Sequence, residues 1–304
     1  MPLDPQVKKL MDQRAANGGN PVPMTTPGPA VYRAEDRIIA GQGSGIPIRV
    51  YTPLGNGPFP ALVWFHGGGW IGGSVDSVDS QARHLCKGAE CVVVSVDYRL
   101  APQHKFPAPV EDCYTATAWT ARNAALFNID PNRIAVGGTS AGSNLAAGVA
   151  LMARDRKEPR LVLQVLVYPV TDRNFTTKSY QENGGGEYGL SKQSMTEMWD
   201  KYLAKTEDAK NPYAAPLQAK SLAGLPPALV QTAEYDPLRD EGEAYAAALK
   251  KAGVPTTCTR YPGLTHGFFG QWSQVDKAMT AVNEAVGALK VAYSAKTPQP
   301  AGRR

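Results

Sequence analysis

Apolar residues gather in short continuous runs along the chain, and these runs predict the strands of a buried sheet. Runs rich in Val, Ile and Leu that lack alternation are typical of parallel strands covered on both faces. Such runs occur at residues 61–65, 91–96, 134–138, 161–168, 228–232 and 256–261. Before them, residues 36–40 and 46–51 predict a hairpin with an antiparallel edge strand, because apolar and other residues alternate in the second segment.

Helical segments separate most of these strands. They lie at about 107–126, 142–155, 240–252 and 273–293, and each is bounded by Pro, Gly or Asp signals. Strands that alternate with helices are typical of a mostly parallel sheet with helices on both faces. The pattern therefore predicts an α/β fold with a mostly parallel central sheet of about eight strands.

Two segments interrupt this rhythm. Residues 1–30 combine a short amphipathic helix with a linker rich in Gly and Pro, and residues 173–222 are a polar insertion with an amphipathic piece around Trp199. We expect a single domain over residues 1–304, with a helical cap built from about 1–40 and about 173–222. The tail, at about 296–304, is expected to be disordered.

Composition and charge exclude several classes of protein. With 43% hydrophobic and 19% charged residues, the chain is too apolar for a disordered protein. The net charge of +5 comes without a long run of Lys or Arg, which argues against nucleic acid as a partner. The apolar runs are too short for a bilayer span, and the N-terminus lacks the features of a secretory signal, so we expect no membrane partner.

The cysteines and the missing metal motifs argue against a metalloprotein and a disulfide-rich protein. The 4 cysteines are scattered without a zinc spacing, and they are too few for a disulfide framework in a chain of 304 residues. Zinc-protease, phosphate-loop and EF-hand motifs are missing from the sequence, so no metal site is expected. Unpaired cysteines favour a reduced compartment, which predicts a cytoplasmic protein.

A candidate nucleophile follows the run at 134–138. The chain continues as Gly-Thr-Ser-Ala-Gly, the G-x-S-x-G pattern of a nucleophile elbow on a sharp turn from strand to helix. Glycine on both sides of Ser140 lets the strand and the helix approach without a Cβ clash. The helix N-terminus then offers backbone N–H groups to an oxyanion, beginning with that of Ala141. An inert serine in a glycine-rich turn is the alternative.

A second glycine-rich segment, His-Gly-Gly-Gly-Trp, follows the run at 61–65. Successive glycines let the backbone approach a ligand, and HGGG is known as an oxyanion-hole loop. We predict that the N–H groups of Gly67 and Gly68 join that of Ala141, while His66 and Gly69 support the loop. A flexible glycine turn is the alternative.

A nucleophilic serine needs a base, and the base needs an acid to orient it. His266 follows the last predicted strand, and Asp236 follows the strand before it. The order Ser140, Asp236, His266 along the chain is the order of catalytic triads in α/β folds whose serine lies on a G-x-S-x-G elbow. All three residues lie at carboxyl ends of predicted parallel strands, where such sheets place their sites. We predict a triad of Ser140 as nucleophile, His266 as base and Asp236 as acid.

The small number of histidines limits the alternatives for the base. His84 falls in a predicted helix and His104 lies beside a proline, and both are expected at the surface. Asp240, one turn after Asp236 and expected in the following helix, and Asp172, which follows the run at 161–168, stay open as alternative acids. Asp97, after the run at 91–96, is expected to be a buried ion-pair partner or hydrogen-bond anchor of the fold.

Taken together, the motifs HGGGW, DYRLAP, FPAPVED, GTSAGSNLA, YPVTD, DPLRDEG and HGF resemble the hormone-sensitive-lipase-like family of esterases. The form GTSAG resembles the subgroup named after it, and the matches run from about residue 31 to 270. The resemblance implies an α/β-hydrolase catalytic domain with a helical cap, no cofactor and often a homodimer. Gln103 and Ser143 depart from the family pattern, which usually has Glu and Gly there.

The prediction is a carboxylic ester hydrolase that acts on small-molecule esters with short to medium acyl chains, through a Ser-His-Asp triad and a covalent acyl-enzyme. Trp70 and Tyr188 are predicted to line the substrate pocket. A lactonase, amidase or formamidase with the same triad stays open, since fold alone does not fix the substrate. A non-catalytic binding protein is a further alternative. The plant gibberellin receptors resemble the family but lack the catalytic histidine, which His266 would supply here.

Overall fold

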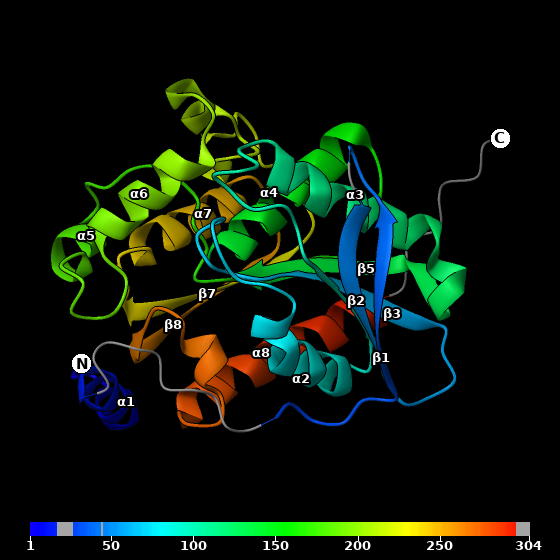
Figure 1. Ribbon diagram of the computed structural model, residues 1–304, viewed down its shortest axis with the longest axis horizontal. Helices are drawn as coiled ribbons and strands as arrows, with labels where there is room; N and C mark the ends of the chain where they lie inside the picture. Colours follow the sequence, from blue (N-terminus) through cyan, green and yellow to red (C-terminus); the bar gives the residue numbers. More distant parts are fainter. Residues whose placement is uncertain (17–26, 44, 296–304) are drawn as a thin grey trace.

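The computed structural model describes residues 1–16, 27–43 and 45–295, and within these ranges eight strands form one sheet (Figure 1). The strands are β1 Arg33–Ala40, β2 Gly45–Thr52, β3 Phe59–Phe65, β4 Val92–Val96, β5 Ile129–Thr139, β6 Leu163–Val167, β7 Ala228–Tyr235 and β8 Thr256–Thr265. Their order across the sheet is β1-β2-β4-β3-β5-β6-β7-β8. β2 is antiparallel to β1 and to β4, and the other neighbours are parallel, which confirms the predicted fold.

Burial explains why the predicted runs lack alternation. Every residue of β4 and β6 is buried, and so is every residue of β3 except the first. In β2 burial alternates through Ile46, Ile48 and Val50, as the hairpin prediction requires. However, β2 is not the edge strand. The mostly exposed β1 pairs along its whole length and takes the edge position.

Helices cover both faces of the sheet (Figure 1). Those on one face are α3 (Ala108–Arg122), α4 (Ala141–Arg156) and α7 (Arg239–Lys251). Those on the other face are α2 (Asp79–Ala89) and α8 (Asp276–Ser294). Short 3-10 helices occupy Asp76–Val78, Ala124–Phe127, Thr206–Lys210, Pro216–Gln218 and Phe268–Gln271. Successive strand residues point to opposite faces, so Leu62 and Val63 of β3 belong to two separate hydrophobic cores.

Two segments lie outside this alternation. The N-terminal helix α1 (Pro5–Ala16) lies near β8, with Val7 buried (Figure 1). Between β6 and β7 come α5 (Lys178–Asn183) and α6 (Lys192–Tyr202), whose Trp199 joins the core on the α4 side. Residues 33–40, which were expected in the cap, are strand β1 instead, because their backbone pairs with β2. The predicted linker at 17–26 and the tail at 296–304 lie outside the described residues.

Candidate active site

Ser140 lies at the turn between β5 and α4, and Ala141 is the first residue of the helix. Its backbone has φ 55° and ψ −120°, a strained combination for a residue with a side chain. A Cβ on Gly138 would lie 2.5 Å from the carbonyl oxygen of Phe65, and a Cβ on Gly142 would overlap the same oxygen. Both glycines are therefore needed, because the end of β3 packs directly against the elbow.

A chain of hydrogen bonds joins Ser140 to His266 and Asp236. Asp236 follows β7 and His266 follows β8, and these two strands are neighbours in the sheet. His266 Nδ1 donates to Asp236 Oδ2 at 2.8 Å, while its Nε2 lies 3.1 Å from Ser140 Oγ. The other oxygen of the fully buried Asp236 accepts the N–H of Leu238 at 2.9 Å. Both carboxylate oxygens are thus satisfied, as a buried charge requires.

Tyr168 packs against the imidazole of His266, with ring centroids 4.6 Å apart. It follows β6 with φ 38°, and its N–H donates to the carbonyl of Gln231 at 2.6 Å. Burial raises the pKa of its phenol, so the ring stays neutral beside His266. Sequence reasoning missed this residue, because its place behind His266 depends on how three strands end side by side.

The alternative bases and acids lie away from this chain of hydrogen bonds. His84 is half-buried against Trp272, with ring centroids 4.0 Å apart, so its predicted surface position is wrong. His104 is exposed, as predicted. The carboxylates of Asp240 and Asp172 accept hydrogen bonds from residues of the inserted segment. Neither acid contacts a histidine through a described hydrogen bond.

The glycine-rich loop after β3 runs past the elbow. A Cβ on Gly67 would lie 3.4 Å from the Cβ of Ser140, so this part of the loop lies against the serine. Gly68 and Gly69 have φ values of 116° and 61°, a region that favours glycine. A Cβ on Gly69 would overlap the side chain of Met198 in α6. The loop therefore lies between Ser140 and α6.

His66 is fully buried behind this loop. Its Nδ1 donates to the carbonyl of Gly67 at 2.8 Å, and its ring stacks on Tyr98 with centroids 4.2 Å apart. Burial lowers the pKa of the imidazole and keeps the ring neutral. The Asp97 carboxylate lies 3.8 Å from the ring but is 37% exposed, so the predicted buried role of Asp97 is wrong: its carboxylate reaches solvent.

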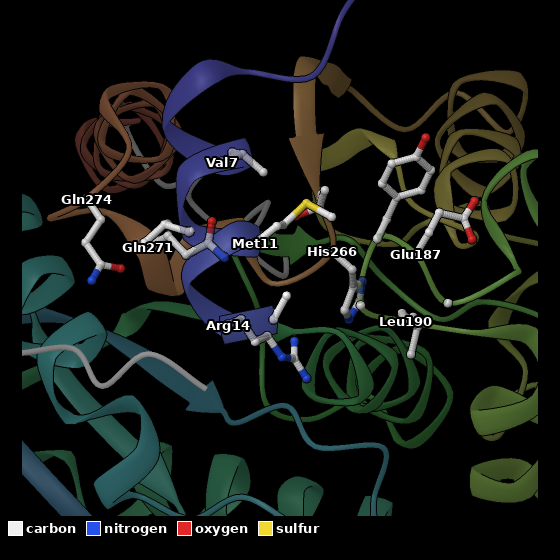
Figure 2. Close-up of a pocket in the computed structure, with 14 residues that line it drawn as sticks. Val7, Met11, Arg14, Glu187, Leu190, His266, Gln271 and Gln274 are labelled. Carbon is white, nitrogen blue, oxygen red and sulfur yellow. The ribbon is translucent and has the colours of Figure 1, made fainter. Parts of the chain in front are cut away.

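A cavity of about 540 Å³ lies beside His266 (Figure 2). Its lining comes from three segments far apart in the sequence, namely α1, the loop before α6 and the turn after β8. Figure 2 shows Val7, Met11 and Arg14 on one side of α1, facing His266 and Leu190. Apolar side chains of the N-terminal helix thus form one wall of the cavity next to the predicted base.

Of the two residues predicted to line the substrate pocket, one lines this cavity and the other does not. Tyr188 lines the cavity, and its ring packs on Tyr235 with centroids 4.8 Å apart. Trp70 does not line it, and the prediction for this residue is wrong. Its side chain turns into the core, stacks on Tyr202 and donates from Nε1 to Asn144, so it is fully buried.

In the described parts of the chain, His, Cys, Asp and Glu side chains nowhere gather in threes as a metal site would need. No helix within those parts has the length and apolarity to cross a bilayer. Cys86, Cys91, Cys113 and Cys258 are free thiols.

Solved structures resemble this fold along nearly its whole length. A hyperthermophilic esterase from the archaeon Pyrobaculum calidifontis has a TM-score of 0.90 and 42% sequence identity, over 96% of this chain and 99% of that one. A thermostable esterase from Pseudomonas putida also has a TM-score of 0.90, with 34% identity over 97% of this chain and 99% of the other.

Curated relatives match at similar identity. A carboxylic ester hydrolase of Mycobacterium tuberculosis, LipN, is 42% identical over 275 residues, which are 88% of this chain and 73% of the relative. An arylesterase of Saccharolobus solfataricus is 38% identical over 95% of this chain and 98% of its own length. A family model described as the alpha/beta hydrolase fold matches residues 62–270. The chain therefore belongs to the alpha/beta hydrolase family, among the hormone-sensitive-lipase-like esterases.

Proposed function

We propose that this chain, a carboxylic ester hydrolase by its family, cleaves small esters with short to medium acyl chains through a Ser140–His266–Asp236 triad. The observation that carries the proposal is the continuous set of hydrogen bonds from Ser140 Oγ through the imidazole of His266 to the carboxylate of Asp236. A serine hydroxyl is a weak nucleophile unless a base takes its proton, and the base acts best when an acid orients it.

The first half of the reaction forms an acyl-enzyme. Ser140 Oγ bonds to the ester carbonyl carbon while its proton passes to His266 Nε2, and the π electron pair moves onto the carbonyl oxygen. Backbone N–H groups of Gly67, Gly68 and Ala141 hold this oxyanion. When the tetrahedral intermediate collapses, the bond to the alcohol oxygen breaks and His266 returns the proton to the leaving alcohol.

The second half repeats these steps with water. His266 takes a proton from water as the water oxygen bonds to the acyl carbon. When this second tetrahedral intermediate collapses, the bond from the acyl carbon to Ser140 Oγ breaks, His266 returns the proton to Oγ, and the carboxylic acid is released. Asp236 orients the imidazole and stabilises its protonated form throughout. His66 and Gly69 support the glycine loop. Apart from water, all of these steps use the chain's own groups, so the mechanism calls for no cofactor or metal.

The walls of the cavity support the substrate class. α1 and the inserted segment, which we propose as the cap of a single catalytic domain, enclose about 540 Å³ beside His266. Apolar contacts from Val7, Met11 and Leu190 suit a short acyl or alkyl chain. Tyr188 adds an aromatic wall.

Replacement of the nucleophile tests the mechanism. Ser140→Ala should lower kcat for p-nitrophenyl butyrate by about 10⁴-fold or more, because loss of a triad nucleophile removes the whole covalent route. Circular dichroism should show the wild-type fold. Ser294→Ala removes an exposed serine of α8 and serves as the matched control, with wild-type activity expected. Turnover near the wild-type rate in Ser140→Ala would refute the triad.

A substrate panel separates the ester proposal from its rivals. Esters of graded chain length, lactones and anilides should be compared at equal enzyme concentration, with kcat/KM as the readout. We expect the butyrate and hexanoate esters to lead. Higher kcat/KM on a lactone or an anilide would assign the same triad to a different bond.

A further inference from the structure

The oxyanion hole of the proposed mechanism is assembled from two separate segments. Gly67 and Gly68 belong to the loop after β3, whereas Ala141 begins α4. Donors stabilise an oxyanion when they lie about 2.7–3.1 Å from it. The separation of loop and helix must therefore be held to a fraction of an ångström.

Backbone packing against α4 fixes the start of the loop. There, Gly142 of α4 lies directly against the carbonyl oxygens of Phe65 and His66. The chain then passes through three successive glycines, which have the largest conformational freedom of any residue. The carbonyl of Gly68 accepts the N–H groups of Ile71 and Gly72 at 3.2 and 3.1 Å, and that of Trp70 accepts the N–H of Ala101 at 2.9 Å. None of these bonds reaches α4, so a contact after Gly69 must hold the far end of the loop against this helix.

Trp70 is the residue at that far end, and its side chain reaches α4. Its Nε1 donates to Asn144 Oδ1 at 3.2 Å, and both side chains are fully buried. The backbone of Trp70 has φ 61°, a left-handed conformation that is strained for any residue with a side chain. Such strain persists only where the surroundings hold the residue in place.

Asn144 is held rigidly at the other side of this bond. Its backbone N–H donates to the carbonyl of Ser140 at 3.1 Å, so it lies one helical turn after the nucleophile. Its Nδ2 donates to the carbonyls of Val170 at 3.0 Å and Ala214 at 2.8 Å. These two bonds use both amide protons and aim Oδ1 at Trp70.

The inserted segment holds the Trp70 ring from its other side. Tyr202 of α6 stacks on it with centroids 4.3 Å apart and 4° between the planes, and Trp199 packs at 4.8 Å. Met198, on the same helix, covers Gly69. The ring is thus enclosed between α4 and α6.

We propose that Trp70 and Asn144 form a positioning pair that sets the distance between the two halves of the oxyanion hole. The pair joins the end of the glycine loop to the helix that carries Ser140 and Ala141. It rests on the proposed function, because it acts through the N–H groups that hold the oxyanion. Neither residue touches the substrate.

Trp70→Phe is the variant that tests the pair, because it keeps an aromatic ring and removes the Nε1 donor. We expect kcat for p-nitrophenyl butyrate to fall by about 10–100-fold, since misplaced donors weaken only the transition state. KM should change by less than about threefold, because ground-state binding is untouched. A purely structural role would not produce this split.

A boronic acid reports on the hole directly. Its boron accepts the electron pair of Ser140 Oγ while the serine proton passes to His266, and the tetrahedral adduct presents an oxygen to the hole. Butylboronic acid should bind Trp70→Phe more weakly by about the factor lost in kcat. Trp119→Phe, which changes a half-buried tryptophan of α3, is the matched control and should keep the wild-type kcat and affinity.

A double-mutant cycle on kcat tests the coupling between Trp70 and Asn144 in a second way. In an Asn144→Ala background, Trp70→Phe should cost little more, because the bond is already lost. Additive losses would overturn the pair. So would a Trp70→Phe enzyme with wild-type kcat and boronic acid affinity, even if its melting temperature fell.

Ser140→Ala keeps the two proposals apart. If it stays fully active, the triad fails and the pair has no oxyanion to serve. If it is inactive while Trp70→Phe has wild-type kcat and boronic acid affinity, the triad stands and the pair alone is overturned.

Discussion

A buried hydroxyl joins α4, the helix that begins directly after Ser140, to the strands beside it. Ser143 Oγ lies 2.6 Å from the carbonyl oxygen of Gly138 and accepts the N–H of Val167 at 2.8 Å. Glycine is usual at this position in the family that the motifs resemble, and glycine could make neither bond. Buried backbone groups need hydrogen-bond partners. The Ser143 hydroxyl is such a partner for both groups, which would otherwise need water or another polar group.

His66 makes the stability of this protein depend on pH. Burial lowers the pKa of its imidazole below the unfolded value of about 6.5. Below that pH His66 binds a proton in the unfolded chain but stays neutral in the folded protein until the pH reaches its lower folded pKa. The contribution of His66 to stability is therefore fully present above about pH 6.5 and is lost as the pH falls toward the lower folded pKa.

His66→Asn tests this linkage, since an asparagine amide can still donate toward Gly67. As the pH falls from about 7.5 to about 5.5, the wild-type free energy of unfolding should fall more steeply than that of the variant, by up to about 1.4 kcal/mol per pH unit. Chemical denaturation at several pH values measures both slopes. Because burial also lowers the pKa of His84, some slope should survive in the variant. Parallel curves would contradict the prediction.

At the scale of elements, the approach of α4 to β3 depends on a glycine. A Cβ on Gly142 would overlap the carbonyl oxygens of Phe65 and His66. Gly142→Ala should therefore push the helix away, lowering the free energy of unfolding by about 1–3 kcal/mol, as overpacking does. It should also lower kcat, since Ser140 and Ala141 move with the helix.

Gly287→Ala is the matched control for this prediction. Gly287 is an exposed glycine of α8, and a Cβ there would meet nothing within 4 Å. Alanine in a helix interior is favoured over glycine, so this variant should gain about 0.5–1 kcal/mol and keep its activity. Thermal melts and ester hydrolysis compare the two variants. Equal stability in both would show that the predicted overlap is relieved without cost.

At the scale of the whole molecule, the cavity is closed by segments that meet only after folding. α1 is fixed on the sheet by Asp4, whose backbone N–H donates to the carbonyl of Gly263 at 3.0 Å and whose carboxylate lies 3.0 Å from Lys277. Gly263 has φ 78°, and a Cβ there would lie 2.9 Å from the Asp4 nitrogen. The same turn leads to His266, so α1 and this histidine are positioned together.

Met11→Ala should enlarge this cavity and favour longer substrates. We expect kcat/KM for octanoate relative to butyrate to rise by about tenfold, since each methylene in such a pocket contributes about 1–3 kcal/mol. Acyl esters of p-nitrophenol and butyrates of graded alcohols should both be measured, because the series that responds identifies the half of the ester bound there. Lys9→Ala, on an exposed position of α1, is the control. An unchanged preference in both series would contradict the prediction.

Much of the fold could be predicted because strands and helices leave local patterns. The β3, β4 and β6 runs are continuous because both faces of those strands are buried, and each lies within about two residues of its predicted bounds. The three residues of the proposed triad could also be picked out, since each of them directly follows a strand end. Membership of the GTSAG subgroup and homodimer formation stay predictions.

The sequence by itself determined the mostly parallel sheet, the glycine-flanked Ser140 and the candidate base and acid, because backbone sterics and strand burial act on neighbouring residues. Only the tertiary structure decided that Trp70 belongs to the core and that Tyr168 lies behind His266. It also decided that α1 forms a wall of the cavity. These contacts join residues far apart in the chain, 74 positions for Trp70 and Asn144. Their geometry depends on how whole elements pack, and no local pattern records it.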